Sequence, residues 1–374
     1  MMTSLVNLDA LGVSNLSEAA GKAMSQWLGT NASPSSLHIL GEAAAEAVEL
    51  GRDQIRSALG GKNTRVIFTS GAGESDNLAV IGASQKGKRK GKHILVCQAD
   101  PLSVIQAAKS LSKQGWSVES VPVDSKGIID LDALAKMLKV NTTFVSCHLV
   151  NEETGVIQPV AEVVELVREK SPHAHIHSSA RAAVNRLHFN LDWLGLDSLS
   201  IDSQCAGGPS GIGALLLKDN IRINSILHGG AEEGGMRPGS LSTALVAGMG
   251  AAYCGINELS CEVNTEVERI ISEKLMNLQW TIMPKYCAPG IISIRLPVGA
   301  DALVLECGLA GVLLSPSSGC TASTGGPSHV LIAMGISEND ALQTIRISLT
   351  HGFDILEISH ACDVISDTIG KITA

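Results

Sequence analysis

The sequence predicts an α/β protein built around a mainly parallel sheet. Short apolar runs rich in β-branched residues alternate with helix-length amphipathic segments. Hydrophobic residues make up 45% of the 374 positions and charged residues only 17%, which excludes a disordered chain. Strands separated by helices pair in parallel, because a helix is the usual crossover between parallel strands. Functional side chains are therefore expected just after the strands, at the carboxyl edge of the sheet.

The elements follow in order along the chain. Strands are predicted at 66–68, 93–96, 118–121, 143–146, 175–177 and 198–201. Helices are predicted at 101–114, 130–139 and 160–170, where apolar residues recur at helical spacing. The uncharged run 241–256 predicts a buried helix, because it is shorter and more interrupted than a membrane span of about 20 apolar residues. Beyond it, a different mix of elements predicts a second, smaller domain.

Charge and cysteine content narrow the function classes. The chain has 28 Lys and Arg against 37 Asp and Glu, a formal net charge of −9, which argues against binding to nucleic acid. The residues from Met1 to Asp9 lack the basic and apolar regions of a secretory signal. Nine cysteines without paired spacing fit a reducing compartment better than a disulfide framework. We expect a soluble, cytoplasmic protein that contacts no membrane.

Two motifs could be mistaken for sites. His173, His175 and His177 alternate along one predicted strand, but no cysteine or acidic residue joins them at that spacing, so we expect a feature of the sheet rim and no metal. The glycines of 207–213 resemble a dinucleotide-binding loop. They follow the sixth strand, however, and no ribose-binding acid stands at the usual distance.

Eight segments together resemble a known family in order and in spacing. They are 33–38, 68–77, 151–159, 208–214, 228–239, 318–321, 327–331 and 345–349. In these segments the chain is similar to the cysteine desulfurases, pyridoxal phosphate (PLP) enzymes of the aminotransferase class V type. The resemblance implies a fold-type-I PLP-dependent transferase architecture. It implies a large domain at 15–255 with a mostly parallel seven-stranded sheet, and a smaller α+β domain formed by 1–14 and 256–374.

The resemblance also implies an activity. Such enzymes hold PLP on a lysine, take sulfur from L-cysteine, and leave alanine and a persulfide on a loop cysteine. Here the persulfide position is Cys320, in the small domain, and the arginine that binds the substrate carboxylate is Arg346. Asn151 is the retained contact of the site. The alternatives are that Cys320 is an inherited thiol without a role and that Arg346 forms a structural ion pair.

The sequence departs from the family at the cofactor positions. The lysine position is Cys205, and a thiol cannot form an imine. Cys205 is expected to fill the space of the lysine, with a second sulfur-handling thiol as the alternative. Six further cofactor positions have changed: Gln204, Asp202, Ser179, Ala182, Asp100 and Gly73. A carboxylate at Asp202 would repel a phosphate unless a counter-charge lies beside it. We therefore expect no bound cofactor and no desulfurase activity.

Three functions compete at this point. The first is a desulfurase-like pseudoenzyme of sulfur or iron–sulfur cluster metabolism that accepts a persulfide or binds a partner. The second is an active PLP-dependent cysteine desulfurase, and the third is a scaffold or regulator without catalysis. We expect a homodimer, with an active desulfurase paralogue or an iron–sulfur scaffold protein as other partners. Residues 230–240 resemble the loop that reaches the neighbour's cofactor phosphate, and this loop keeps Arg237 and a hydroxyl at Ser240.

Overall fold

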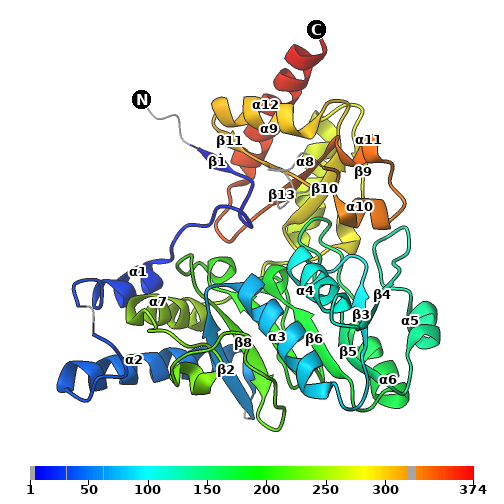
Figure 1. The fold of residues 1–374 in the computed structure, drawn as a ribbon. Helices are drawn as coiled ribbons and strands as arrows, with labels where there is room; N and C mark the ends of the chain where they lie inside the picture. Colours follow the sequence, from blue (N-terminus) through cyan, green and yellow to red (C-terminus); the bar gives the residue numbers. More distant parts are fainter. Residues whose placement is uncertain (1–4, 31, 62, 318–325) are drawn as a thin grey trace.

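A seven-stranded sheet forms the centre of the larger part of the molecule (Figure 1). The computed structural model describes residues 5–30, 32–61, 63–317 and 326–374. In spatial order the strands are β2 (Thr64–Thr69), β8 (Gly213–Lys218), β7 (Ser198–Asp202), β6 (His175–Ser179), β5 (Thr142–Ser146), β3 (His93–Cys97) and β4 (Ser117–Val121). Strand β8 is antiparallel to both of its neighbours, and the other pairs are parallel. The predicted mostly parallel sheet is confirmed, and all six predicted strands are present.

Helices cover both faces of this sheet, because successive strand side chains point to opposite sides. Ile94 and Val96 of β3 belong to the core beneath α3 and α4, whereas Leu95 and Cys97 belong to the core on the other face. The helices of this part are α1 (Glu18–Ser25), α2 (Ile39–Ile55), α3 (Ala72–Gly87), α4 (Leu102–Ser112), α5 (Leu131–Met137), α6 (Val160–Lys170) and α7 (Thr243–Cys254).

The four predicted helices of this part are confirmed. Helices α4, α5 and α6 lie within the predicted ranges, and α7 is the buried helix predicted at 241–256. Helix α7 packs against α1 and α2, and the Ser242 hydroxyl caps its first turn by accepting from the Leu245 N–H. No helix in the described ranges is both long and apolar enough to cross a membrane.

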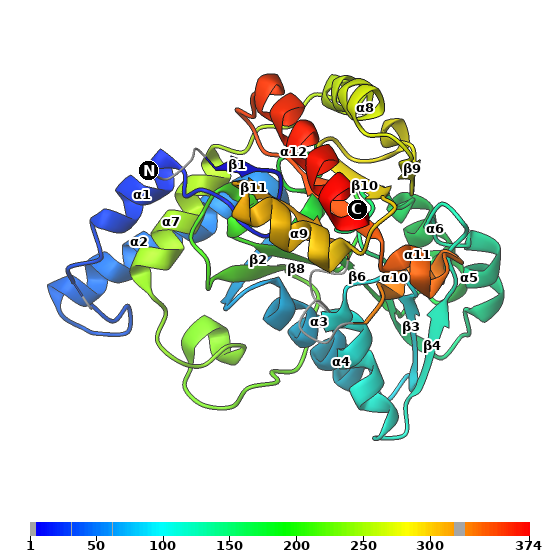
Figure 2. The ribbon, with the colours of Figure 1, turned by 90° about the horizontal axis from the view of Figure 1, so that it is seen from above.

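A second group of strands and helices lies above the large sheet (Figures 1 and 2), and it has a hydrophobic core of its own. Its strands are β1 (Val6–Asn7) paired with β11 (Val312–Leu313), and the antiparallel set β12 (Ser315–Pro316), β13 (Thr344–Ser348), β10 (Ile291–Arg295) and β9 (Gln279–Trp280). Its helices are α8 (Glu262–Lys274), α9 (Ala300–Leu309), α10 (His329–Ala333), α11 (Glu338–Ala341) and α12 (Ile355–Thr373). Val6 and Leu8 pack into this core with residues from 267 to 365.

The two cores support a division of the chain into two domains. We propose the boundaries that the sequence indicated: a large domain at 15–255, and a small domain that joins the N-terminal residues up to 14 with 256–374. The N-terminal segment pairs with the small domain, because Asp9 forms a bridge with Ser348 of β13.

Candidate functional site

A pocket of about 460 Å³ opens where the small domain meets the carboxyl edge of the large sheet. Residues that directly follow β3, β5 and β6 form its floor, as expected for a parallel sheet. Five residues that the sequence singled out line it: Gly73, Asp100, Asn151, Ser179 and Arg346. The N-terminal segment adds Asp9 to the wall. The fold thus brings most of the predicted site together.

The beginning of helix α3 contributes one wall of the pocket. Ala72 and Gly73 are its first residues, so their backbone N–H groups have no partner within the helix. One turn later, the buried Asp76 accepts from the Ser103 hydroxyl at 2.6 Å and lies 3.1 Å from His177 Nε2. This helix start can bind an anion, as helix N-termini do.

Asp100 joins the ends of two strands and orients a buried imidazole. One carboxylate oxygen accepts the Cys97 N–H at 3.0 Å, and the other accepts the His148 N–H at 2.7 Å and lies 3.0 Å from His148 Nδ1. Burial disfavours a charge on the ring, but hydrogen bonds with Asp100 and Cys97 outweigh it and raise the pKa of His148 to about 9. His148 and His329 both line the pocket, although the sequence assigned neither.

Cys97, Asp100 and His148 offer atoms that could coordinate a metal ion. One atom from each of Cys97, Asp100 and His148 lies within 4.8 Å of the other two, and all three residues are buried.

The histidines that the sequence placed at the sheet rim lie elsewhere, and the prediction of a rim feature is wrong for two of them. His175 and His177 are buried inside the sheet, where both rings contact the Ser198 hydroxyl.

Arg181 is the main cation of the pocket wall, and the sequence did not identify it. Its guanidinium contacts Asp202 Oδ2 and Glu152 Oε2, each at 2.5 Å, and donates to the Leu11 carbonyl at 2.6 Å. Glu152, together with Asp202, raises the pKa of Arg181 above its usual value. Asp202 therefore has Arg181 as its counter-charge. The repulsion between an unpaired Asp202 carboxylate and a phosphate, which the sequence left open, does not arise.

Arg346 is held by a carboxylate of its own chain. Its Nη2 lies 2.5 Å from Asp9 Oδ1, and its Nη1 donates to the Glu152 carbonyl at 3.4 Å. Glu153 stands nearby and accepts hydrogen bonds from the Ser317 and Ser328 hydroxyls. Burial raises the pKa of Glu153 to about 7, against the opposing effects of Ser328 and Arg346. The pocket thus contains a carboxyl group that titrates near neutral pH.

The remaining predicted residues lie outside this pocket. Cys205 and Gln204 form a 3-10 turn after β7 and line a neighbouring cavity, which shares only Leu11 with the pocket. Asp202 and Ala182 are buried and line neither space. Cys320 lies outside the described residues. That Cys205 fills the space of the family's lysine stays a prediction.

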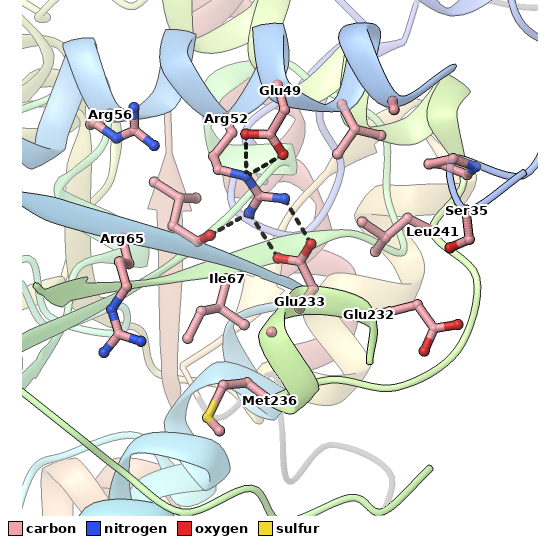
Figure 3. A pocket seen from close by; sticks show the side chains of 15 residues that line it. Ser35, Glu49, Arg52, Arg56, Arg65, Ile67, Glu232, Glu233, Met236 and Leu241 are labelled. Atoms are coloured by element: carbon pink, nitrogen blue, oxygen red, sulfur yellow. Dashed lines mark hydrogen bonds and ion pairs between the residues drawn. The ribbon is translucent and has the colours of Figure 1, made fainter. Parts of the chain in front are cut away.

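The predicted loop at 230–240 is anchored from within the chain (Figure 3). Arg52 of α2 points at Glu233 and pairs with both carboxylate oxygens, at 2.8 and 2.7 Å, and Glu233 also accepts the Phe68 N–H. This pair closes one side of a cavity of about 450 Å³. Arg237 lies 3.3 Å from Glu74 of α3, and Ser240 is exposed.

The sequence profile of the aminotransferase class-V family matches residues 6–359. The chain belongs to this family. It is 34% identical over 324 residues to "Cysteine desulfurase IscS 1" of Archaeoglobus fulgidus, with 84% of each chain covered. It is also 34% identical over 383 residues to "Cysteine desulfurase IscS" of Salmonella arizonae, covering 98% of this chain and 93% of that protein.

Solved structures agree with this placement. A "NifS-like protein" superposes with a TM-score of 0.89 at 25% identity and covers 98% of this chain and all of its own. The structure titled "SspA in complex with cysteine" superposes with a TM-score of 0.81 at 28% identity, covering 92% and 98% of the two chains. The fold-type-I architecture is therefore confirmed.

These findings correct the prediction about the cofactor. Members of this family are PLP-dependent cysteine desulfurases, so PLP is the expected cofactor, and the prediction of no cofactor is wrong. The start of α3, with Ala72 and Gly73, fits a phosphate, and Asn151, the cofactor contact that the resemblance implies, lines the same pocket. Among the described residues that line the pocket there is no lysine. The pocket therefore offers groups that could hold the phosphate and the ring of PLP.

Proposed function

We propose that the protein handles cysteine-derived sulfur as a persulfide-accepting or partner-binding subunit that does not use the family's lysine chemistry. The observation that carries this proposal is the position of Cys205. Its thiol cannot form an imine, and it lines a different cavity from Arg346 and Asn151. The described residues that line the pocket include no lysine, so no side-chain amine is available there; the basic side chains are arginines and histidines.

A second candidate is an active PLP-dependent cysteine desulfurase that converts L-cysteine to L-alanine and an enzyme persulfide. The comparisons favour it over the first, because relatives that cover nearly the whole chain carry that name. When bound, PLP withdraws electrons from the α-carbon of an amino acid. Arg346 would bind the substrate carboxylate after Asp9 has moved away. Glu153 could then hold or release a proton at its carboxyl group, since burial raises its pKa to about 7.

Turnover with added cofactor separates the two candidates. The purified protein is incubated with PLP, L-cysteine and a reductant, and alanine and sulfide are measured beside an active desulfurase. The first candidate expects no alanine above the level of an Arg346→Gln variant. It also expects none from Cys205→Lys, because the other changed cofactor positions, Asp202 and Ser179 among them, stay as they are. Alanine formation that requires Arg346 would establish the second candidate.

Acceptance of sulfur is tested separately. The family motif assigns the persulfide to Cys320, and a thiol needs only access and thiolate character to attack a persulfide. With an active desulfurase as donor, we expect a persulfide on Cys320, and we expect no labelling of Cys320→Ser although its other eight cysteines remain. Equal labelling of both proteins would favour a scaffold or regulator.

We further propose a homodimer. The chain exposes large apolar side chains at the start of α2 and before it, where Leu37, Ile39 and Leu40 are 105%, 80% and 54% exposed. Such a surface is unusual for a monomer, and symmetric pairs are the commonest oligomers. Native mass spectrometry, alone and after co-expression with an active desulfurase paralogue, distinguishes a homodimer from a heterodimer and from a monomer.

A further inference from the structure

The cavity beside Cys205 differs from the main pocket in its charges. It measures about 470 Å³ and extends from exposed residues such as Asn15 and His351 to the buried Arg186 and Cys205. Among the described residues that line it there is no Asp or Glu, although the main pocket has five of them. Arg186 is the one arginine in this lining.

Arg186 has no carboxylate partner. It is 5% exposed, and its two hydrogen bonds go to the carbonyl oxygens of Val184 at 3.2 Å and Leu349 at 2.9 Å. Its Nε is buried without any partner in the described structure. A buried charge is costly unless an opposite charge or several hydrogen bonds compensate it. Arg186 has no opposite charge beside it in the described structure, and its hydrogen bonds leave Nε without a partner.

The neighbouring groups do not supply the missing charge. Burial, together with Asp202, raises the pKa of the Cys205 thiol far above its usual value, so the thiol is neutral at neutral pH. Burial lowers the pKa of Arg186 to about 10, and Arg346 and Arg181 act in the same direction. Asp202 and Glu152, the nearby acids, are already paired with Arg181. Arg186 therefore stays charged at neutral pH without a counter-ion.

We propose that this cavity binds a small oxygen-bearing anion, a carboxylate or a sulfur oxyanion, whose charge is balanced by Arg186. Gln204 and Thr350 can donate further hydrogen bonds from the cavity wall, because their side chains have no hydrogen-bond partner in the described structure. The site is distinct from the amino-acid pocket, and it does not depend on Cys320 or on PLP.

Protection of Cys205 from a small neutral thiol reagent tests the site in the full chain. The protein is treated at pH 9, where more of the Cys205 thiol is ionised than at neutral pH and Arg186 is still charged, with methyl methanethiosulfonate in sodium sulfate, in sodium acetate, or in sodium chloride of equal ionic strength. The rate at Cys205 is followed by peptide mass spectrometry. An anion at ten times its Kd should slow the reaction about tenfold, while exposed Cys254 should react equally in all three. Protection by acetate alone identifies a carboxylate site, and protection by sulfate alone a sulfur-oxyanion site.

Variants assign the effect to Arg186. Arg186→Gln should remove the protection, and Arg186→Lys should keep part of it because the charge remains. Arg222→Gln is the matched control, since this exposed arginine lines neither cavity. Equal rates at Cys205 in wild-type protein in all three salts would overturn the proposal, even if Arg186→Gln does not fold. Protection that persists in Arg186→Gln would overturn it as well.

Discussion

The Glu153 carboxyl should make the stability of the protein fall as the pH rises toward neutrality. Glu153 is enclosed by Ser317, Ser328 and the Arg346 side chain, and burial raises its pKa from 4.5 to about 7. Between these two values the folded protein holds a proton that the unfolded chain has released. The stabilisation from this group is therefore complete below pH 4.5 and is lost as the pH rises through about 7.

The size of the effect follows from the two pKa values. One pKa unit corresponds to about 1.4 kcal/mol, so the full difference is worth about 3 kcal/mol. Glu153→Gln keeps the shape and an oxygen that accepts the serine hydroxyls, but it cannot ionise. Relative to wild type, the variant should gain up to about 3 kcal/mol in free energy of unfolding between pH 4 and pH 8.

Urea unfolding at a series of pH values measures this difference. Ser328→Ala is the matched variant, because removing a hydroxyl that favours the charged form should raise the pKa of Glu153 further. The fall in stability should then extend to higher pH. If the difference between wild type and Glu153→Gln is the same at pH 5 and pH 8, the carboxyl ionises normally in the folded protein and the reasoning fails.

Three further perturbations test the same site. Arg181→Met leaves Glu152 and Asp202 unpaired and should cost about 3 kcal/mol in urea unfolding, whereas an unchanged midpoint would show that water already screens both acids. Asp9→Asn removes the charge that holds Arg346 and should tighten the binding of L-alanine measured by calorimetry; an equal or weaker affinity would contradict this. Asp100→Asn should lower the pKa of the His148 ring in an NMR titration, because Asp100 is one of the groups that raise it.

The sequence predicted the fold well because the signals were local and repeated. Each parallel strand is a short apolar run between amphipathic helices, and buried strands such as β3 and β5 match the predicted ranges within two residues. The family motifs then fixed the topology. The position of Asn151 and Arg346 in one pocket followed from the same motifs.

Arg181 and His148, which the sequence did not identify as pocket residues, have no local sequence pattern that marks them. Arg181 lies between Ser179 and Ala182, and its neighbours in the sequence do not distinguish it from an exposed arginine. Its role depends on Glu152 and Asp202, which approach it only through the packing of β6 and β7. His148 becomes a pocket residue because β3 and β5 are neighbours, and this places its ring against Asp100. Pairings of this kind require the tertiary structure.

The main pocket and the cavity beside Cys205 differ in how their arginines are paired. In the main pocket each arginine already has an acid of the same chain: Arg181 has Glu152 and Asp202, and Arg346 has Asp9. A substrate carboxylate must displace Asp9 from Arg346, so part of its binding energy is spent on breaking an existing ion pair. At Arg186 no pair has to be broken, because the guanidinium donates only to carbonyl oxygens. A small anion should therefore bind beside Cys205 more readily than at Arg346, unless Asp9 is released first.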